Sequence, residues 1–270
     1  MPFFESKPLR LHYQIQGQGT GPRLLFIPGT ASDLRQELQI FKSALANRFE
    51  ILSFDQRGIG QSNSPDPEPT MQTYAADAKH LLDHVGWKHC HCMGESFGGM
   101  AAQEFALQYP ERVEKLVLAV TSSGGAGGSS FPYHEHDISK MSIEERSDFW
   151  VQCGDLRYAK PDWKKTELYR RQYENYLEVF QLREENPHKG LFSQRQIAAR
   201  KGHDTYERLP ALKKQVFICG GRYDKTAPLT NQLALFHQIP HSRLALFEGS
   251  HMLLWQDPFA FESIASFLMV

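Results

Sequence analysis

Short apolar runs alternate with segments of helical spacing along most of the chain, and this alternation restricts the fold more than any other feature. Continuous apolar runs are typical of buried strands, whereas apolar residues three and four apart are typical of amphipathic helices. The strand-like runs span residues 24–27, 49–54, 89–93, 113–120, 215–220 and 243–247. The helical spacing recurs over residues 34–45, 71–85, 228–239 and from 258 onward. Strands that alternate with helices form a mainly parallel sheet covered on both faces, so the sequence predicts an α/β fold.

The start of the chain has a different pattern. Residues 9–15 alternate apolar and polar positions, which is the period of a half-buried strand. The turn sequence QGQGTGP follows them, so we expect an edge hairpin here.

The middle of the chain also breaks the alternation. Residues 124–208 open with the flexible sequence GGAGGSS and then contain helical patterns, the clearest over residues 163–185. One face of that helix carries Tyr169, Tyr173, Tyr176 and Phe180. We expect an α/β core of residues 1–123 and 209–270, with residues 124–208 inserted as a helical cap.

Composition and charge limit the partners. The 270-residue chain is 41% hydrophobic and 23% charged, enough apolar material for one sizeable core. Lysine and arginine number 30 against 31 aspartates and glutamates, which gives a formal net charge of −1. A balanced charge gives no general attraction to nucleic acid or to an anionic membrane. We therefore expect a small-molecule substrate, with no nucleic-acid or membrane partner and an unknown oligomeric state.

Targeting signals and cysteines indicate the compartment. The opening sequence MPFFESKPLRLHY lacks a basic segment followed by an apolar one, and no long apolar run follows. The four cysteines are Cys90, Cys92, Cys153 and Cys219. Three of them lie in strand-like runs, where cysteine behaves as a small hydrophobic residue. These features predict a soluble protein of the reducing cytoplasm.

A lone serine lies between glycines in the sequence MGESFGGM, residues 93–100. Gly94, Ser96 and Gly98 match the pattern G-x-S-x-G, in which a strand turns sharply into a helix and the serine hydroxyl projects alone. A serine hydroxyl is a weak nucleophile at neutral pH, so it needs a histidine base and an acid that orients this base. Ser96 is a candidate nucleophile, and an ordinary glycine turn is the alternative.

The acid and the histidine should follow the serine if the order is Ser, Asp, His. Asp224 lies just beyond the predicted strand at 215–220, and His251 lies just beyond the one at 243–247. Open parallel sheets place their functional sites at such strand ends. Residues 121–124, after the strand at 113–120, offer no acid. The sequence therefore predicts a catalytic triad of Ser96, Asp224 and His251.

Five segments together resemble the capped α/β-hydrolase fold, and the resemblance covers essentially the whole chain. They are FIPGTASD (26–33), DQRGIGQS (55–62), GESFGG (94–99), GGRYDKTAP (220–228) and EGSHMLLWQDP (248–258). The resemblance implies a serine hydrolase without a cofactor, in which the backbone N–H groups of Thr30 and Phe97 hold the oxyanion. It also implies that the charged turn with Asp55 and Arg57 is structural.

Some branches of this family fit less well. The sequence has Pro28-Gly29 where many relatives have His-Gly, and it lacks the HGGG of lipases and esterases. Ser96 disfavours the branches with a carboxylate nucleophile, and Met252 stands where carbon–carbon bond hydrolases usually carry Trp. We expect hydrolysis of a small ester, lactone or related carbonyl compound. Carbon–carbon bond hydrolysis, perhydrolysis and ligand sensing with little turnover stay open as alternatives.

The run of residues 89–92, His-Cys-His-Cys, does not predict a metal site. Alternate side chains of a strand point to opposite faces, so these four residues cannot close one tetrahedral zinc site. No second Cys and His cluster at ligand spacing occurs, and we expect no metal. Three further histidines are expected on the surface or at helix caps, namely His134, His136 and His203.

The expected cap supplies side chains for a substrate cavity. Its aromatic residues include Phe131, Tyr133, Phe149, Trp150, Tyr158 and Trp163. Some of these should line the cavity and favour an apolar or aromatic substrate group. Its cations include Arg157, Lys160, Lys164 and Lys165. Such cations usually form a solvated face, and a carboxylate-binding role for one of them, such as Arg157, is a hypothesis.

Overall fold

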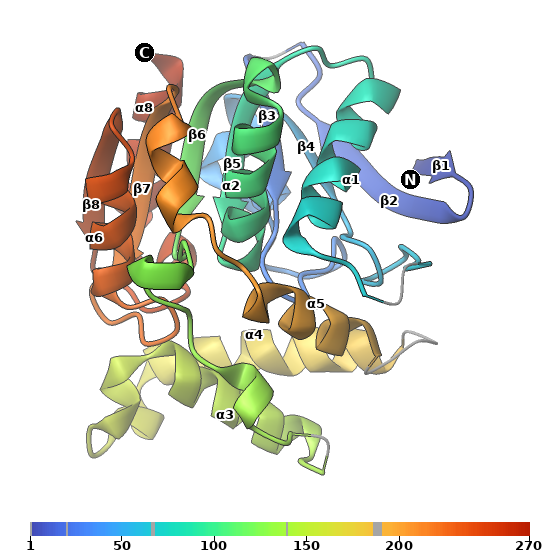
Figure 1. Cartoon of the computed structure of the whole chain (residues 1–270). Coiled ribbons are helices and arrows are strands. Elements are labelled where there is room, and N and C mark those ends of the chain that lie inside the picture. Colours follow the sequence, from blue (N-terminus) through green and yellow to red (C-terminus); the bar gives the residue numbers. More distant parts are fainter. Residues whose placement is uncertain (1, 20, 66–67, 139, 186–190) are drawn as a thin grey trace.

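A single eight-stranded sheet forms the centre of the computed structural model, which describes all residues except 1, 20, 66–67, 139 and 186–190 (Figure 1). The strands are β1 (Phe3–Ser6), β2 (Leu9–Gln16), β3 (Arg23–Ile27), β4 (Glu50–Phe54), β5 (Cys90–Glu95), β6 (Val113–Ala119), β7 (Gln215–Gly221) and β8 (Ser242–Phe247). Their order across the sheet is β1-β2-β4-β3-β5-β6-β7-β8. The pairs β1–β2 and β2–β4 are antiparallel and the other pairs are parallel, so the predicted α/β fold is confirmed.

The predicted edge hairpin pairs β2 with β1, which precedes it in the chain. Its turn therefore lies between Ser6 and Leu9, and not in the glycine-rich sequence after Gln16 as we expected. That sequence instead leads to β3, which is separated from β2 by β4.

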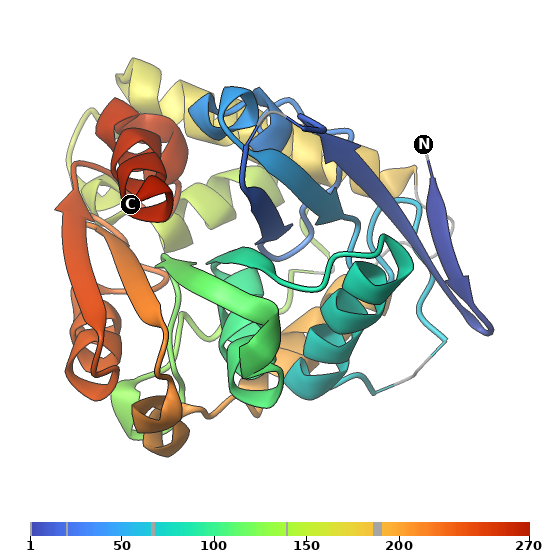
Figure 2. The ribbon, with the colours of Figure 1, turned by 90° about the horizontal axis from the view of Figure 1, so that it is seen from above.

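Helices cover both faces of the sheet (Figure 2). On one face lie α1 (Met71–His84), α2 (Phe97–Gln108) and α6 (Leu229–Gln238). On the other lie α8 (Pro258–Met269) and the short turns η1 (Ile40–Lys42) and η2 (Ala44–Asn47). Each face has its own apolar core, because alternate residues of a strand point to opposite faces. Thus Leu25 packs in one core and its neighbour Leu24 packs in the other.

Three further helices lie at the carboxyl ends of the parallel strands (Figure 1). They are α3 (Ile143–Gly154), α4 (Glu167–Glu184) and α5 (Leu191–Lys201), and they follow β6 and precede β7 in the chain. The division into a core and a cap stays a prediction, and the position of these helices is compatible with it. No helix in the described part of the chain is long and apolar enough to cross a membrane.

The predicted amphipathic helix over residues 34–45 is wrong, since this segment contains η1 and η2 instead. Ser43 lies between the two turns, where its hydroxyl donates to Ile40 O (2.6 Å) and accepts from Leu45 N (3.2 Å). Such local bonds to the backbone compete with the hydrogen bonds of an α-helix. The apolar residues of this segment are still buried, since Phe41 and Leu45 are both in the core.

The predicted helix over residues 163–185 begins later than expected. Trp163–Lys165 form a separate short turn, and α4 starts at Glu167 with Thr166 as its cap. The Thr166 hydroxyl oxygen accepts a hydrogen bond from Tyr169 N (3.2 Å) and donates one to Trp163 O (2.7 Å). This double use of one side chain separates the turn from the helix.

Hydrogen bonds and an ion pair of its own buried side chains hold the charged turn after β4 in place. The buried carboxylate of Asp55 accepts hydrogen bonds from Leu34 N (2.8 Å) and Gln61 N (2.9 Å) and lies 2.7 Å from His12 Nδ1. The Arg57 guanidinium is paired with Asp77 on α1. These contacts agree with the structural role that the family resemblance implied.

The histidines and cysteines around β5 are arranged as a strand and not as a metal site. Cys90 and Cys92 are buried in one core, while His91 lies against Phe49 on the other side of the sheet. His89 lies just before the strand and is exposed. Within the described residues, no three His, Cys, Asp or Glu side chains gather in a group suited to a metal ion.

We expected His134, His136 and His203 on the surface or at helix caps, and this expectation is only partly met. His136 is exposed, and the side chain of His134 lies outside the described residues. His203 is buried with its Nε2 3.2 Å from Ser122 O, so the surface alternative is wrong for this residue. The loop after β6 covers this ring, a contact that the local sequence pattern does not encode.

Candidate active site

Ser96 lies in a sharp turn between β5 and α2. Its backbone has φ 52° and ψ −116°, a strained conformation for a residue with a side chain. The flanking glycines leave room for this turn: a Cβ on Gly94 would lie 2.4 Å from Gly98 O, and a Cβ on Gly98 would lie 1.9 Å from Ile27 O. The backbone N–H of Ser96 donates to Ala119 O (2.9 Å). The glycine pattern therefore fixes the serine at the carboxyl end of β5.

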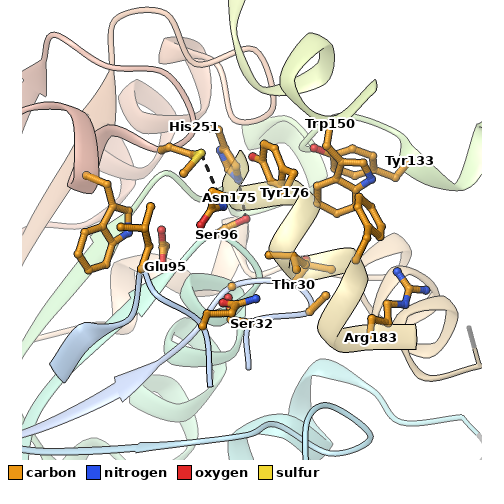
Figure 3. Close-up of a pocket in the computed structure, with 18 of the residues that line it drawn as sticks. Thr30, Ser32, Glu95, Ser96, Tyr133, Trp150, Asn175, Tyr176, Arg183 and His251 are labelled. Carbon is orange, nitrogen blue, oxygen red and sulfur yellow. Dashed lines mark hydrogen bonds between the residues drawn. The ribbon is translucent and has the colours of Figure 1, made fainter. Parts of the chain in front are cut away.

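His251 joins Ser96 to Asp224. Figure 3 shows His251 beside Ser96 at the cavity. Its Nε2 lies 2.8 Å from Ser96 Oγ, and its Nδ1 lies 3.1 and 3.0 Å from the two carboxylate oxygens of Asp224. The three residues follow β5, β7 and β8, so strand ends that are far apart in sequence meet here. The structure brings the three predicted residues together, and their catalytic role stays a prediction.

The end of α3 and the loop after β7 hold the acid and the histidine in place. His251 N donates to Gly154 O (3.1 Å), and the Asp224 carboxylate accepts from Ala227 N (2.8 Å). Asp224 is buried, and this burial raises the pKa of its carboxyl, although His251 and the nearby backbone N–H groups oppose the rise. The carboxylate is thus fixed behind the imidazole and screened from water.

The two predicted oxyanion donors lie at the same edge of the sheet. Phe97 is the first residue of α2, where backbone N–H groups have no partner within the helix. Thr30 lies in the loop after β3 and lines the same cavity as Ser96. Among the described residues, neither N–H has a hydrogen-bond acceptor. The neighbouring Ala31 N donates to Gln196 Oε1 on α5 (2.9 Å), which anchors the Thr30 loop.

A cavity of about 90 Å³ opens beside Ser96 and His251. Its aromatic wall consists of Tyr133, Trp150, Tyr176 and Phe180. The rings of Tyr133 and Trp150 are stacked with their centroids 4.6 Å apart. Two of the predicted cap aromatics therefore line the cavity, and Trp163 instead packs under the Arg157 guanidinium.

The charged residues of the cavity are not those that we named from the sequence. Arg157 forms an ion pair with the buried Asp155 (2.8 Å), so the hypothesis that it binds a substrate carboxylate is not supported. Lys160, Lys164 and Lys165 are not among the residues that line the cavity either. The cations that line it are Arg183 on α4 and Arg200 on α5, and Glu95 adds a carboxyl next to the nucleophile.

The chain belongs to the α/β-hydrolase fold family, whose model matches residues 22–258, and the predicted resemblance is confirmed. A poly(3-hydroxyalkanoate) depolymerase of Ectopseudomonas oleovorans is 26% identical over 221 residues, covering 79% of this chain and 72% of that protein. A proline iminopeptidase of Lactobacillus acidophilus is 31% identical over 171 residues, covering 61% and 57%. The crystal structure of an enol-lactonase from Burkholderia xenovorans superposes with a TM-score of 0.81 at 20% identity, covering 100% of both chains, and shows that the fold is shared.

Proposed function

We propose that this protein is a cofactor-free serine hydrolase that cleaves a small ester, lactone or related carbonyl substrate. One observation carries the proposal: a single imidazole contacts both the Ser96 hydroxyl (2.8 Å) and the buried Asp224 carboxylate (3.0 Å). This is the relation between nucleophile, base and orienting acid that acyl transfer requires. Membership in a family whose named relatives are hydrolases supports it further.

The first half of the reaction forms an acyl-enzyme. With a proton on Nδ1 facing Asp224, the Nε2 of His251 accepts the Ser96 proton as Oγ attacks the substrate carbonyl carbon. The carbonyl oxygen becomes negative and accepts hydrogen bonds from the N–H groups of Thr30 and Phe97. The α2 dipole adds to this stabilisation. His251 then gives its proton to the leaving oxygen, which departs as an alcohol or, in a lactone, stays on the acyl chain.

The second half releases the acid. His251 takes a proton from water, and the resulting hydroxide attacks the acyl carbon. The bond to Ser96 Oγ breaks, and the serine recovers its proton from His251. Water is consumed and every proton is returned, so no cofactor is required for the balance.

The cavity supports a small substrate with an apolar or aromatic part. Its volume of about 90 Å³ and its stacked aromatic wall suit such a group better than a polymer chain. The structurally similar enol-lactonase and the relative named a depolymerase act on different substrates by name, so the choice between ester and lactone is left to a substrate screen. The free, buried cysteines support a cytoplasmic location.

The test is covalent labelling with a fluorophosphonate, followed by intact mass measurement. We expect one adduct on the wild type, no adduct on Ser96→Ala, and much slower labelling of His251→Ala. Wild type that is folded but not labelled would contradict the proposal. A positive result is followed by a screen of short esters and lactones. Labelling without multiple turnover, together with a ligand-dependent rise in Tm, would favour the sensor alternative instead.

A further inference from the structure

Arg200 is directed toward the cavity by the helix that carries it. Four residues earlier on α5, the buried Gln196 accepts a hydrogen bond from Ala31 N beside Thr30 (2.9 Å). Residues four apart lie on the same face of a helix. The face of α5 that holds the Thr30 loop is therefore also the face that bears Arg200, and both Thr30 and Arg200 line the cavity with Ser96.

Two contacts hold the Arg200 guanidinium in place. Its Nη2 donates to Phe131 O (3.2 Å), and its Cζ lies 5.1 Å from the centroid of the Tyr133 ring. Tyr133 is fixed in turn by stacking on Trp150 and by a 2.9 Å hydrogen bond between its hydroxyl and Thr226 Oγ1. A backbone carbonyl and an aromatic face orient this cation without neutralising it.

Arg200 has no carboxylate partner in the described part of the chain. Two other inward-facing arginines each have a carboxylate partner: Arg57 is paired with Asp77, and Arg157 is paired with Asp155. Burial lowers the pKa of Arg200 from its ordinary value, since the charge loses contact with water. A partly buried charge without a counter-ion is unfavourable, and an anionic ligand would offset that cost.

The charged side chains around the cavity differ in sign on the two sides of Ser96. Arg183, whose pKa is lowered by burial to about 10, adds a second guanidinium to the lining. Figure 3 shows Arg183 and Glu95 on opposite sides of Ser96. An anionic substrate group is therefore attracted to the arginine side and repelled from the Glu95 side when that carboxyl is ionised.

We propose that Arg200 binds a carboxylate of the substrate, so that the preferred substrate is a small ester or lactone that also carries a free carboxylate. The planar guanidinium offers two parallel N–H donors, which match the two oxygens of a carboxylate. Tyr176, Trp150 and Tyr133 form a continuous aromatic wall, with centroids 5.7 and 4.6 Å apart, along which the apolar part of the substrate lies. This inference rests on the hydrolase function proposed above.

The test compares kcat/KM for matched pairs of substrates. On the acyl side, monomethyl succinate, adipate and suberate are compared with methyl butyrate, hexanoate and octanoate. On the alcohol side, acetoxybutyrate is compared with butyl acetate. In each pair a carboxylate replaces a terminal methyl group. For at least one pair we expect the wild type to prefer the acid by about tenfold or more, since charge-assisted hydrogen bonds are strong.

Variants then locate the source of this preference. Arg200→Gln should lose about tenfold or more in kcat/KM for the preferred acid and little for its neutral partner. Arg200→Lys should retain part of the preference, because it keeps the charge without the fork. Lys201→Gln removes the next, exposed charge of the same helix and should leave the preference unchanged. An equal acid-to-neutral ratio in wild type and Arg200→Gln for every pair would overturn the inference.

A binding experiment separates this inference from the proposed function. The half-ester that binds best is titrated by calorimetry into Ser96→Ala and into the double variant Ser96→Ala, Arg200→Gln. At least about tenfold weaker binding to the double variant supports the role of Arg200 even without turnover. Turnover of neutral esters without any dependence on Arg200 keeps the hydrolase function and removes the carboxylate preference. If neither binding nor an acid preference is observed, the inference about Arg200 is also overturned.

Discussion

Glu95 makes the stability of this protein depend on pH in a direction that can be worked out from its position. It is the last residue of β5, directly before Ser96, and its side chain lines the cavity together with Leu38 and Trp255. Among the described residues no cation pairs with it. Burial raises the pKa of the Glu95 carboxyl to about 7, from an ordinary value of 4.5.

The sign follows from proton counting. Between pH 4.5 and about 7, folded Glu95 holds a proton that the unfolded chain has lost, so the free energy of unfolding falls as the pH rises. Above about pH 7 both states are ionised and the loss is constant. The difference between the two pKa values, at about 1.4 kcal/mol per pH unit, gives an upper value of about 3 kcal/mol.

Replacing the carboxyl by an amide should remove this loss. Glu95→Gln keeps the size of the side chain and cannot ionise. We expect the variant to exceed the wild type in the free energy of unfolding by up to about 3 kcal/mol at pH 8, and by less than about 1 kcal/mol at pH 5. Urea unfolding followed by tryptophan fluorescence at the two pH values measures the difference.

The exposed Glu111 provides a matched control. Glu111→Gln also removes one carboxyl, so its change in the free energy of unfolding is measured at the same two pH values for comparison. If the gain from Glu95→Gln is the same at pH 5 and pH 8, the carboxyl of Glu95 is not held in its neutral form and the reasoning fails.

Three further substitutions test the site and its support. Asp224→Asn should lower kcat by about 10³- to 10⁴-fold with little change in KM, measured on any ester that the screen identifies. Gly98→Ala should destabilise the fold by about 2 kcal/mol or more, because its Cβ would lie 1.9 Å from Ile27 O; unchanged urea unfolding would contradict this. Arg57→Ala should cost about 3 to 5 kcal/mol because it removes the buried cation that faces the Asp77 carboxylate, and adding Asp77→Asn should recover part of the loss in the same assay.

Local signals in the sequence were sufficient for the residues at strand ends. Ser96 directly follows its strand, Asp224 and His251 lie in the loops just beyond theirs, and parallel strands bring their carboxyl ends to one edge. The sequence order alone therefore predicted which three side chains would meet. It failed over residues 34–45, where apolar spacing indicated a helix but the hydroxyl of Ser43 closes one turn and opens another.

Such local signals could not show which charged residues of the helices after β6 line the cavity. Arg200 and Lys201 are neighbours of the same charge, yet one lines the cavity and the other is exposed. Only the docking of α5 separates them, and docking is set by contacts distant in sequence. Arg157 was the sequence candidate for binding a carboxylate, but Asp155 already occupies it. A cation close to an acid in sequence is thus a poor candidate for binding a ligand.

The position of α5 links two parts of the proposed mechanism. Gln196 anchors the loop that carries the Thr30 donor, and Arg200, one turn later, faces the region where the far end of a substrate would lie. A carboxylate bound to Arg200 would interact with the same helix that fixes the oxyanion loop. Binding energy from the remote end of the substrate would then stabilise the arrangement at the reacting carbonyl, which is how remote contacts raise kcat as well as affinity. Substrate choice and oxyanion stabilisation would therefore be properties of one helix.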